Sequence, residues 1–332
     1  MNAPPLPSFV QIEPVGQCNL RCAMCPIQYR EAGPPYGPPA FMPFDDYVRL
    51  VDGFPAVREL HLQGLGEPLM HPDFFRMVRH AVARGLVVST NTNLTLLTPR
   101  RVTECVTSGL HAMHVSLDGA SAAVYERIRK GASFTKVIRN LDRVVAAKTA
   151  LLSVTPHLRI TTVVMRANLQ ELADVVTLAH QHGVDDVWVQ HLSHEFGEET
   201  LPAAYAAMRE FVDGETLLAE DSDRVATHFG RARETAASLG IRLRLPSIDT
   251  GPRGPARRGC DWPSRGAYLT YEGDALPCCM VSTADRANMG NMLKDGVSAV
   301  WHGERYAELR SGLANGKPPA ICESCAVYNR TF

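Results

Sequence analysis

Short apolar runs rich in Val, Ile and Leu alternate with longer amphipathic stretches along the first part of this 332-residue chain. This alternation is typical of repeated strand–helix units that build a parallel sheet. Six strands are predicted, at Phe9–Glu13, Val57–Leu62, Leu86–Thr90, Ala112–Leu117, Leu158–Met165 and Asp186–His191. Helices are predicted at Pro72–Arg84, Pro99–Ser108, Phe134–Thr149 and Leu169–His182, the last of them ending before Gly183. We therefore expect an α/β fold built as a partial (β/α)6 TIM-like barrel.

The rhythm changes after the sixth strand, and three parts of the chain are predicted. Residues 1–194 form the barrel, and residues 195–258 form a helical insertion and linker. Within that insertion, Glu195–Gly240 is acidic and alanine-rich without strand signals, and Pro246–Arg258 is rich in Pro, Gly and Arg. Residues 259–332 form a smaller C-terminal unit. The insertion is a candidate closing segment over the substrate.

Composition narrows the classes of partner. The chain is 45% hydrophobic and carries a formal net charge of -1, with acidic and basic residues mixed, so no basic stripe indicates a nucleic-acid groove or an anionic membrane surface. The N-terminal residues lack a signal-peptide pattern, and no run is long enough to span a bilayer. We expect a cytoplasmic protein that acts on a small molecule or a peptide, with no nucleic-acid or membrane partner.

Nine cysteines are unusual in such a protein, because disulfides rarely persist among reduced thiols and clustered cysteines more often bind metal. Two groups stand apart, Cys18, Cys22 and Cys25 near the start and Cys260, Cys278, Cys322 and Cys325 near the end, with Cys105 and Cys279 left over. The spacing predicts two metal sites.

The first group can hold three corners of a cubane iron–sulfur cluster and leave one iron without a protein ligand. A zinc knuckle is the alternative, but zinc prefers four ligands and no histidine follows at finger spacing. The run from Cys18 to Cys25 matches the CxxxCxxC motif, and the chain resembles the radical S-adenosylmethionine (SAM) superfamily. The resemblance implies a [4Fe-4S] cluster whose open iron binds SAM and cleaves it to a 5'-deoxyadenosyl radical. Met24 stands where the family often has an aromatic residue.

Three further motifs follow predicted strands, at the end of the barrel where active sites of such folds are built. The first contains Gly64, Gly66, Glu67 and Pro68, and it resembles the family's GxGEP segment, which implies contact with the amino group of SAM. Asn91 and Asn93 follow the next strand and are candidate SAM-binding residues. Ser116 and Asp118 close the fourth strand and are candidate ligands for the ribose hydroxyls of SAM or for water at its carboxylate. Each loop alone could equally be a turn, and Asp118 could be a cap.

Candidates for substrate chemistry are few. His191 and Gln190 end the sixth strand, and Arg129 is predicted in a helix with Arg127 and Lys130, of which at least two are expected on a solvated face. Thr161 and Thr162 could line the barrel mouth, and His191 could equally be a structural histidine. The catalytic candidates are therefore His191, Arg129 and Gln190.

The C-terminal cysteines resemble a SPASM domain of the shortened twitch type, which implies one auxiliary [4Fe-4S] cluster held by Cys260, Cys278, Cys322 and Cys325. Leu269–Tyr271 and Ala275–Leu276 are the expected hairpin strands, and Gly303–Leu313 the expected helix. A four-cysteine zinc site is the alternative. Cys279 could replace Cys278 as a ligand, and Cys105 is expected to be an inert core thiol.

An auxiliary cluster capped by four cysteines cannot bind substrate, so we expect it to accept an electron in a two-electron oxidation. The cysteine pattern resembles that of an aminocyclitol dehydrogenase, which implies oxidation of a secondary alcohol to a ketone on a sugar or aminocyclitol. Modification of a ribosomal peptide is the alternative, disfavoured because the chain starts almost directly with a strand and shows no leader-binding module. An epimerase that uses Cys105 or Cys279 as hydrogen donor is also compatible with the sequence, and a non-enzymatic metal-binding regulator fits it least well. An external one-electron reductant such as flavodoxin or ferredoxin is expected.

Overall fold

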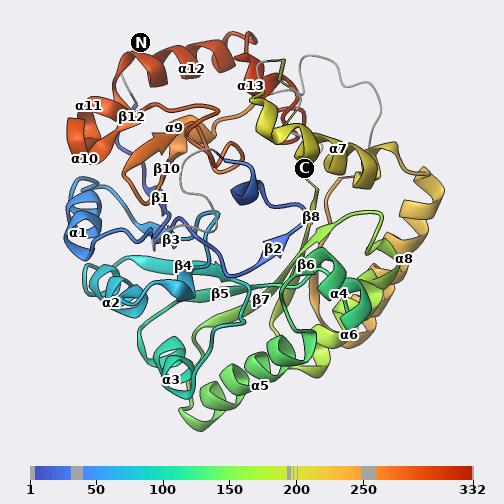
Figure 1. The fold of residues 1–332 in the computed structure, drawn as a ribbon. Helices are drawn as coiled ribbons and strands as arrows, with labels where there is room; N and C mark the ends of the chain where they lie inside the picture. The colour runs from blue at the N-terminus through green and yellow to red at the C-terminus, as the bar shows by residue number, and fades with distance from the viewer. Residues whose placement is uncertain are drawn as a thin grey trace.

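A computed structural model describes residues 4–30, 40–192, 196, 198–199, 201–247 and 259–330. Six parallel strands lie side by side in chain order and curve around a common interior (Figure 1). They are β1 (Phe9–Ile12), β3 (Glu59–Leu62), β4 (Val87–Thr92), β5 (Ala112–Ser116), β7 (His157–Val164) and β8 (Asp186–His191). All six predicted strands are therefore confirmed, and the fold is the expected α/β partial barrel.

Helices cover the outer side of this sheet (Figure 1). They are α1 (Phe44–Asp52), α2 (Phe74–Ala83), α3 (Pro99–Thr107), α4 (Ala122–Ile128), α5 (Phe134–Ala150) and α6 (Leu172–Gln181). Thr98, Ser121 and Ser133 each cap a helix by accepting the backbone N–H three residues further on. The predicted stop before Gly183 is confirmed, because α6 ends at Gln181 and Gly183 has a φ of +64°.

Alternation along the strands separates an apolar outer face from a polar interior. Val88, Val115, Ile160 and Val187 are buried in the main hydrophobic core, which includes apolar residues of the covering helices. Most of the residues that alternate with them on the same strands and face the interior are polar: Ser89, Asn91, His114, Ser116, Arg159, Thr161 and Gln190. The barrel interior is therefore equipped to bind a polar ligand.

After β8 the chain is helical, as predicted for the insertion, with α7 (Ala206–Glu215) and α8 (Ser222–Leu239). A short strand that the sequence pattern does not predict, β9 (Arg242–Arg244), pairs in parallel with β8 and extends the sheet. Most of the predicted linker, residues 248–258, lies outside the described residues.

The C-terminal part continues the barrel sheet on its other side. Its elements are α9 (Trp262–Arg265), β10 (Gly266–Leu269), β11 (Asp274–Leu276), β12 (Gly290–Asn291), α10 (Met292–Asp295), α11 (Val297–Trp301), α12 (Glu304–Ala314) and α13 (Ala320–Glu323). Strand β10 pairs in parallel with β1 and antiparallel with β11. The predicted hairpin is confirmed, but its first strand lies earlier in the chain than expected, from Gly266 to Leu269. It ends at Leu269 because Thr270 already begins the turn, where its carbonyl accepts the N–H of Gly273.

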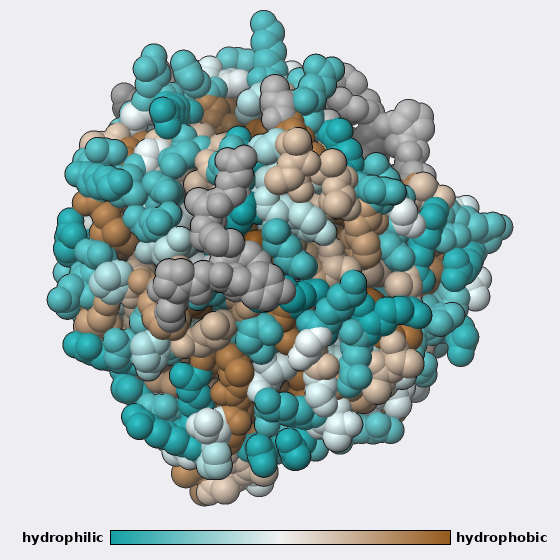
Figure 2. Space-filling view, viewed as in Figure 1, coloured by the Kyte–Doolittle hydropathy of each residue, from teal (hydrophilic) through white to brown (hydrophobic). Residues whose placement is uncertain are grey.

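The face seen in Figure 2 is mostly polar, with apolar residues in small groups among the polar ones. No helix in the described ranges is long and apolar enough to cross a membrane.

Candidate active site

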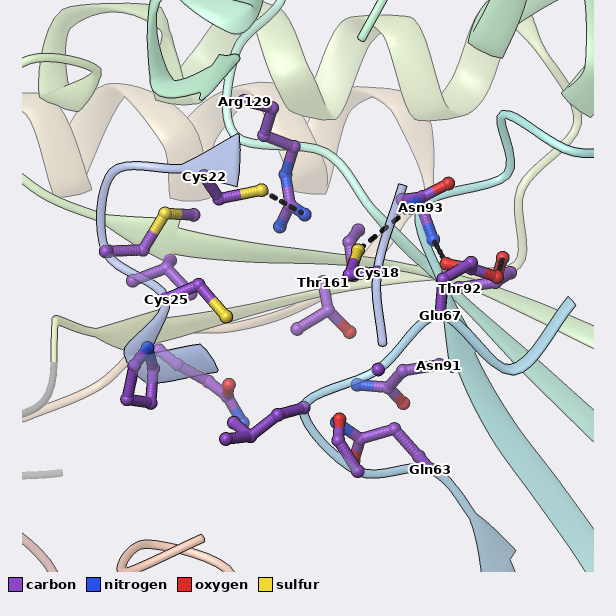
Figure 3. Close-up of a pocket in the computed structure, with 18 residues that line it drawn as sticks. Cys18, Cys22, Cys25, Gln63, Glu67, Asn91, Thr92, Asn93, Arg129 and Thr161 are labelled. Atoms are coloured by element: carbon purple, nitrogen blue, oxygen red, sulfur yellow. Dashed lines mark hydrogen bonds between the residues drawn. The ribbon is translucent and has the colours of Figure 1, made fainter. Parts of the chain in front are cut away.

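The three N-terminal cysteines lie in the loop after β1, at the carboxyl end of the barrel. A two-residue strand, β2 (Arg21–Cys22), pairs antiparallel with β6 (Arg129–Lys130), so Cys22 lies opposite Arg129. Cys25 precedes a short 3-10 helix, η1 (Pro26–Gln28). The thiols of Cys18, Cys22 and Cys25 all face one cavity of about 270 Å³ (Figure 3). The structure thus brings the predicted cluster ligands together.

These thiols fit a cationic cluster. Burial raises the pKa of all three, that of Cys25 to about 12, because a thiolate there loses its hydration. A positive partner such as iron is what allows buried thiolates to form. In the described part of the chain, no group of three or more His, Cys, Asp or Glu side chains is arranged to hold a single metal ion. The three thiols instead surround open space, as a cubane with one open iron would require.

The glycine-rich loop after β3 is held against the barrel by a carboxylate that sequence reasoning missed. Glu13 follows β1, is fully buried, and accepts the N–H groups of Leu65 (2.9 Å) and Gly66 (3.3 Å). A Cβ on Gly64 would lie 2.3 Å from the Glu13 side chain, and one on Gly66 only 1.9 Å from the carbonyl oxygen of Val15. Both positions therefore require glycine, because neighbouring atoms lie too close for a Cβ, and both residues line the cavity.

We expect Gly66→Ala to displace this loop, because its new methyl group would meet rigid backbone. A shift of about 1 Å in a positioning segment can reduce a rate by on the order of a hundredfold. The measurement is 5'-deoxyadenosine formation by the reconstituted variant. The matched control is Gly230→Ala in α8, where nothing lies within 4 Å of the added Cβ. It is expected to retain full activity and to gain about 0.5–1 kcal/mol of stability. Equal behaviour of the two variants would contradict this assignment.

Glu67 lines the cavity, but its carboxylate already serves the neighbouring loop. It accepts the hydroxyl of Thr92 (2.6 Å) and the backbone N–H groups of Asn93 (2.7 Å) and Leu69 (3.1 Å). Burial raises the pKa of Glu67, and these hydrogen bonds oppose that shift. Pro68 does not line the cavity; it begins the 3-10 helix η2 (Pro68–Met70), where its fixed φ suits the first position.

The predicted polar ligands divide into two groups. Asn91, Asn93 and Ser116 line the cavity, and Asn93 Nδ2 lies 3.8 Å from the sulfur of Cys18 (Figure 3). Asp118 does not line it. Its carboxylate is fully buried, accepts the N–H of Val163 (2.8 Å) and forms a 2.7 Å ion pair with Arg129. Asp118 therefore holds a cavity residue in place and is not exposed to a ligand.

The structure places two of the catalytic candidates, Arg129 and His191, differently from the prediction. Arg129 is not in a helix: α4 ends at Ile128, and Arg129 is buried in β6 with Nη1 3.8 Å from the Cys22 sulfur, while Arg127 and Lys130 are exposed as expected. Gln190 lines the cavity, whereas His191 points to the other side of β8 and lies 2.6 Å from the Ser247 carbonyl oxygen. Alternation explains this, because His191 shares its face with the buried residues Val187 and Val189.

The remaining cavity residues are Met24, Pro26, Gln63, Leu65, Thr92, Thr161 and Val163. Of these, Thr161 is predicted at the mouth from the sequence, and Leu65 and Thr92 belong to the motifs that follow the second and third predicted strands. Thr162 instead donates its hydroxyl to the Leu117 carbonyl. Gln63 lies where β3 ends, directly before the glycine-rich motif, so strand position is the signal that could have found it.

The C-terminal cysteines also come together. Cys278 follows β11 and is close enough to Cys325 for the two to interact electrostatically. Cys322, in α13, interacts in the same way with Cys325 and with Cys260. Burial raises the pKa of Cys278, Cys322 and Cys260, so these thiols too need a cation to ionise. Cys279, the next residue in the chain, adds to the raised pKa of Cys278. Cys105 is buried in the core.

Comparison with known proteins agrees with this geometry. The model of the radical SAM superfamily matches residues 12–179, and the SPASM model, described as an iron–sulfur cluster-binding domain, matches residues 260–326.

Curated relatives are similar along most of the chain. The chain is 23% identical to the tungsten-containing aldehyde ferredoxin oxidoreductase cofactor-modifying protein of Pyrococcus furiosus, over 96% of this chain and 87% of that protein. It is 26% identical to mycofactocin maturase MftC of Mycobacterium ulcerans, over 94% and 78% of the two chains. It is 25% identical to the PqqA peptide cyclase of Xanthomonas campestris, over 81% and 66%.

Among solved structures, SuiB of Streptococcus suis bound to precursor peptide SuiA superposes with a TM-score of 0.69 at 15% identity, over 98% of this chain and 71% of that one. This likeness confirms the fold. With the superfamily model covering half of the sequence, the chain belongs to the radical SAM superfamily, carries a C-terminal SPASM domain, and has S-adenosylmethionine and [4Fe-4S] clusters as its cofactors.

Proposed function

We propose that this protein is a radical SAM enzyme that oxidatively modifies a peptide. The support comes from relatives: one is described as a peptide cyclase and another as a maturase, and the similarity to the maturase extends over 94% of this chain. The sequence-based expectation is oxidation of an alcohol on a sugar or aminocyclitol, and none of the three relatives named above is described as acting on such a substrate. Peptide modification is therefore favoured.

The observation that supports an oxidation is that the strands leading to the two cysteine groups are neighbours in one sheet. Strand β1, which precedes Cys18, pairs in parallel with β10, and β10 pairs antiparallel with β11, which ends just before Cys278. The guanidinium of Arg30, in the loop that carries the first group, lies 5.9 Å from the ring centre of Tyr271, which follows β10. A cluster at the second site would therefore lie beside the part of the fold that holds the first.

In this proposal Cys18, Cys22 and Cys25 hold the cluster that binds SAM. When reduced there, SAM supplies a 5'-deoxyadenosyl radical that removes one hydrogen atom from the substrate. The loop of Gly64 to Glu67 and the side chains of Asn91, Asn93 and Ser116 line the same cavity and would surround SAM bound there.

Arg129 and Gln190 remain candidates for substrate positioning because both line the same cavity, and His191 does not. Arg129 forms an ion pair with Asp118, so we expect it to orient the substrate through its fixed positive charge.

The second site would hold the auxiliary cluster through Cys260, Cys278, Cys322 and Cys325. After the hydrogen atom has left, one electron and one proton must still leave the substrate for a two-electron oxidation to balance. The auxiliary cluster would accept that electron, and the proton would pass to solvent or a polar group at the cavity mouth. A flavodoxin or ferredoxin would supply the electron that starts each cycle.

In the test, the reconstituted enzyme is incubated with SAM, reduced flavodoxin and synthetic peptides whose sequences are encoded beside its gene. Peptide mass and 5'-deoxyadenosine are measured in the same reaction. We expect one peptide to lose two hydrogen atoms. The matched control is Cys322→Ala/Cys325→Ala, which should still form the nucleoside but no oxidised peptide. Oxidation of an aminocyclitol to a ketone, with every peptide unchanged, would contradict the proposal.

A further inference from the structure

Four polar residues form one continuous row across the inside of the barrel. Strand pairing places Asn91 of β4 opposite His114 of β5, His114 opposite Arg159 of β7, and Arg159 opposite Asp186 of β8. Asp186 is the first residue of its strand, whereas Asn91 is near the carboxyl end of its own and lines the reaction cavity. The row therefore rises from the bottom of the barrel to the SAM site, and the family motifs explain none of its lower three members.

Each neighbouring pair in the row is within hydrogen-bonding distance. Arg159 donates from Nε to Asp186 Oδ1 (2.7 Å) and from Nη2 to Asp186 Oδ2 (3.1 Å). Its remaining Nη1 lies 3.4 Å from His114 Nε2, and His114 Nδ1 lies 2.8 Å from Asn91 Oδ1. The Arg159 guanidinium also packs 3.3 Å from the ring centre of Trp188, which fixes its plane.

The donor and acceptor roles follow from chemistry. A guanidinium has only donors, so His114 Nε2 must be the acceptor and the ring proton must be on Nδ1. Nδ1–H then donates to Asn91 Oδ1. The opposite orientation of the Asn91 amide would move the proton to Nε2, where it would meet the N–H of Arg159. Burial, His61 and Arg159 lower the pKa of His114 to about 3, so the ring is neutral near pH 7.

With its oxygen turned toward His114, Asn91 presents its amide N–H groups to the cavity. We propose that Asp186, Arg159 and His114 are positioning residues that fix Asn91 as a hydrogen-bond donor to an acceptor atom of bound S-adenosylmethionine. This positioning role requires SAM binding but not the peptide substrate, so it can fail or succeed independently of the proposed function.

The first test uses the unmodified full-length protein. Long-range 1H–15N NMR reports the tautomer of each histidine, and the His114 signals are assigned by their loss in His114→Asn. The proposed orientation of Asn91 requires His114 to carry its proton on Nδ1. An Nε2–H tautomer would overturn it.

The second test measures the Kd of SAM for the reconstituted protein by equilibrium dialysis, without reductant. Asn91→Ala and His114→Phe should each raise the Kd by about tenfold, the equivalent of one hydrogen bond of about 1.4 kcal/mol. The double variant should be no weaker than either single variant, because both remove the same interaction.

The matched control is His114→Asn, whose amide nitrogen can replace Nδ1–H and should restore the Kd to within about threefold of the parent. Iron content and thermal midpoint are compared in every variant, so that loss of folding is recognised. An unchanged Kd in folded Asn91→Ala and His114→Phe would overturn the proposal.

Discussion

Replacing Arg286 with Met is expected to lower the free energy of unfolding by about 3–5 kcal/mol, because it leaves a buried carboxylate without its counter-charge. Arg286 and Glu198 have side chains only 1% and 3% exposed, and Glu198 Oε1 lies 2.8 Å from Nε and 2.7 Å from Nη2 of Arg286. The guanidinium also packs over the rings of Phe196 and Tyr205, at 4.6 and 5.8 Å from their centres. Urea unfolding of the reconstituted full-length protein measures the effect.

Two controls separate the buried charge from other causes. The double variant Arg286→Met/Glu198→Met should recover most of the lost stability, since no charge is then buried alone. Arg49→Met removes the exposed pair of Arg49 with Asp46 (2.9 Å) and should cost less than about 1 kcal/mol. A double variant as unstable as Arg286→Met would contradict the ion pair as the cause.

This ion pair shows what local sequence patterns could not supply. The sequence predicts a helical insertion that is a candidate closing segment, and α7 and α8 confirm the helices. Its attachment was not predictable, because Glu198 and Arg286 are 88 residues apart and each alone looks like a surface charge. Only the fold shows that this ion pair joins the segment to the loop that follows Cys278 and Cys279.

The barrel itself was predictable because its signals are local. Apolar runs of strand length between amphipathic stretches indicated all six strands, and β8 has the predicted ends. Since the carboxyl ends of parallel strands share one edge, the motifs after the first four strands could be expected to converge. The cavity lined by Cys18, Gly64, Asn91 and Ser116 confirms that convergence.

The errors arose where a residue's place depends on a distant partner. Arg129 follows a helical pattern, but it is drawn into β6 by pairing with Cys22, which is 107 residues away. Glu13 appears only as the last residue of a predicted strand, and its role depends on a loop 52 residues later. For His191 the signal was present: it alternates with Gln190, and Val187 and Val189 already identify the outer face of β8.

Replacing Cys18, Cys22 and Cys25 together with Ala is expected to abolish 5'-deoxyadenosine formation. The three thiols are the ligands that the cavity offers to a cluster with an open iron, and no radical can form from SAM without that iron. The C-terminal cysteines lie on other elements and should still assemble their own cluster. The variant therefore loses one site and retains the other, which distinguishes two independent clusters from one shared centre.

The most direct measurement is anaerobic reconstitution with iron and sulfide, followed by iron counting and a 5'-deoxyadenosine assay with a strong reductant in the parent and in this triple variant. We expect about eight irons per chain in the parent and about four in the variant, with nucleoside formed by the parent alone. Zinc in place of iron in the parent, or no cleavage of SAM by the parent, would contradict a radical SAM enzyme with two clusters.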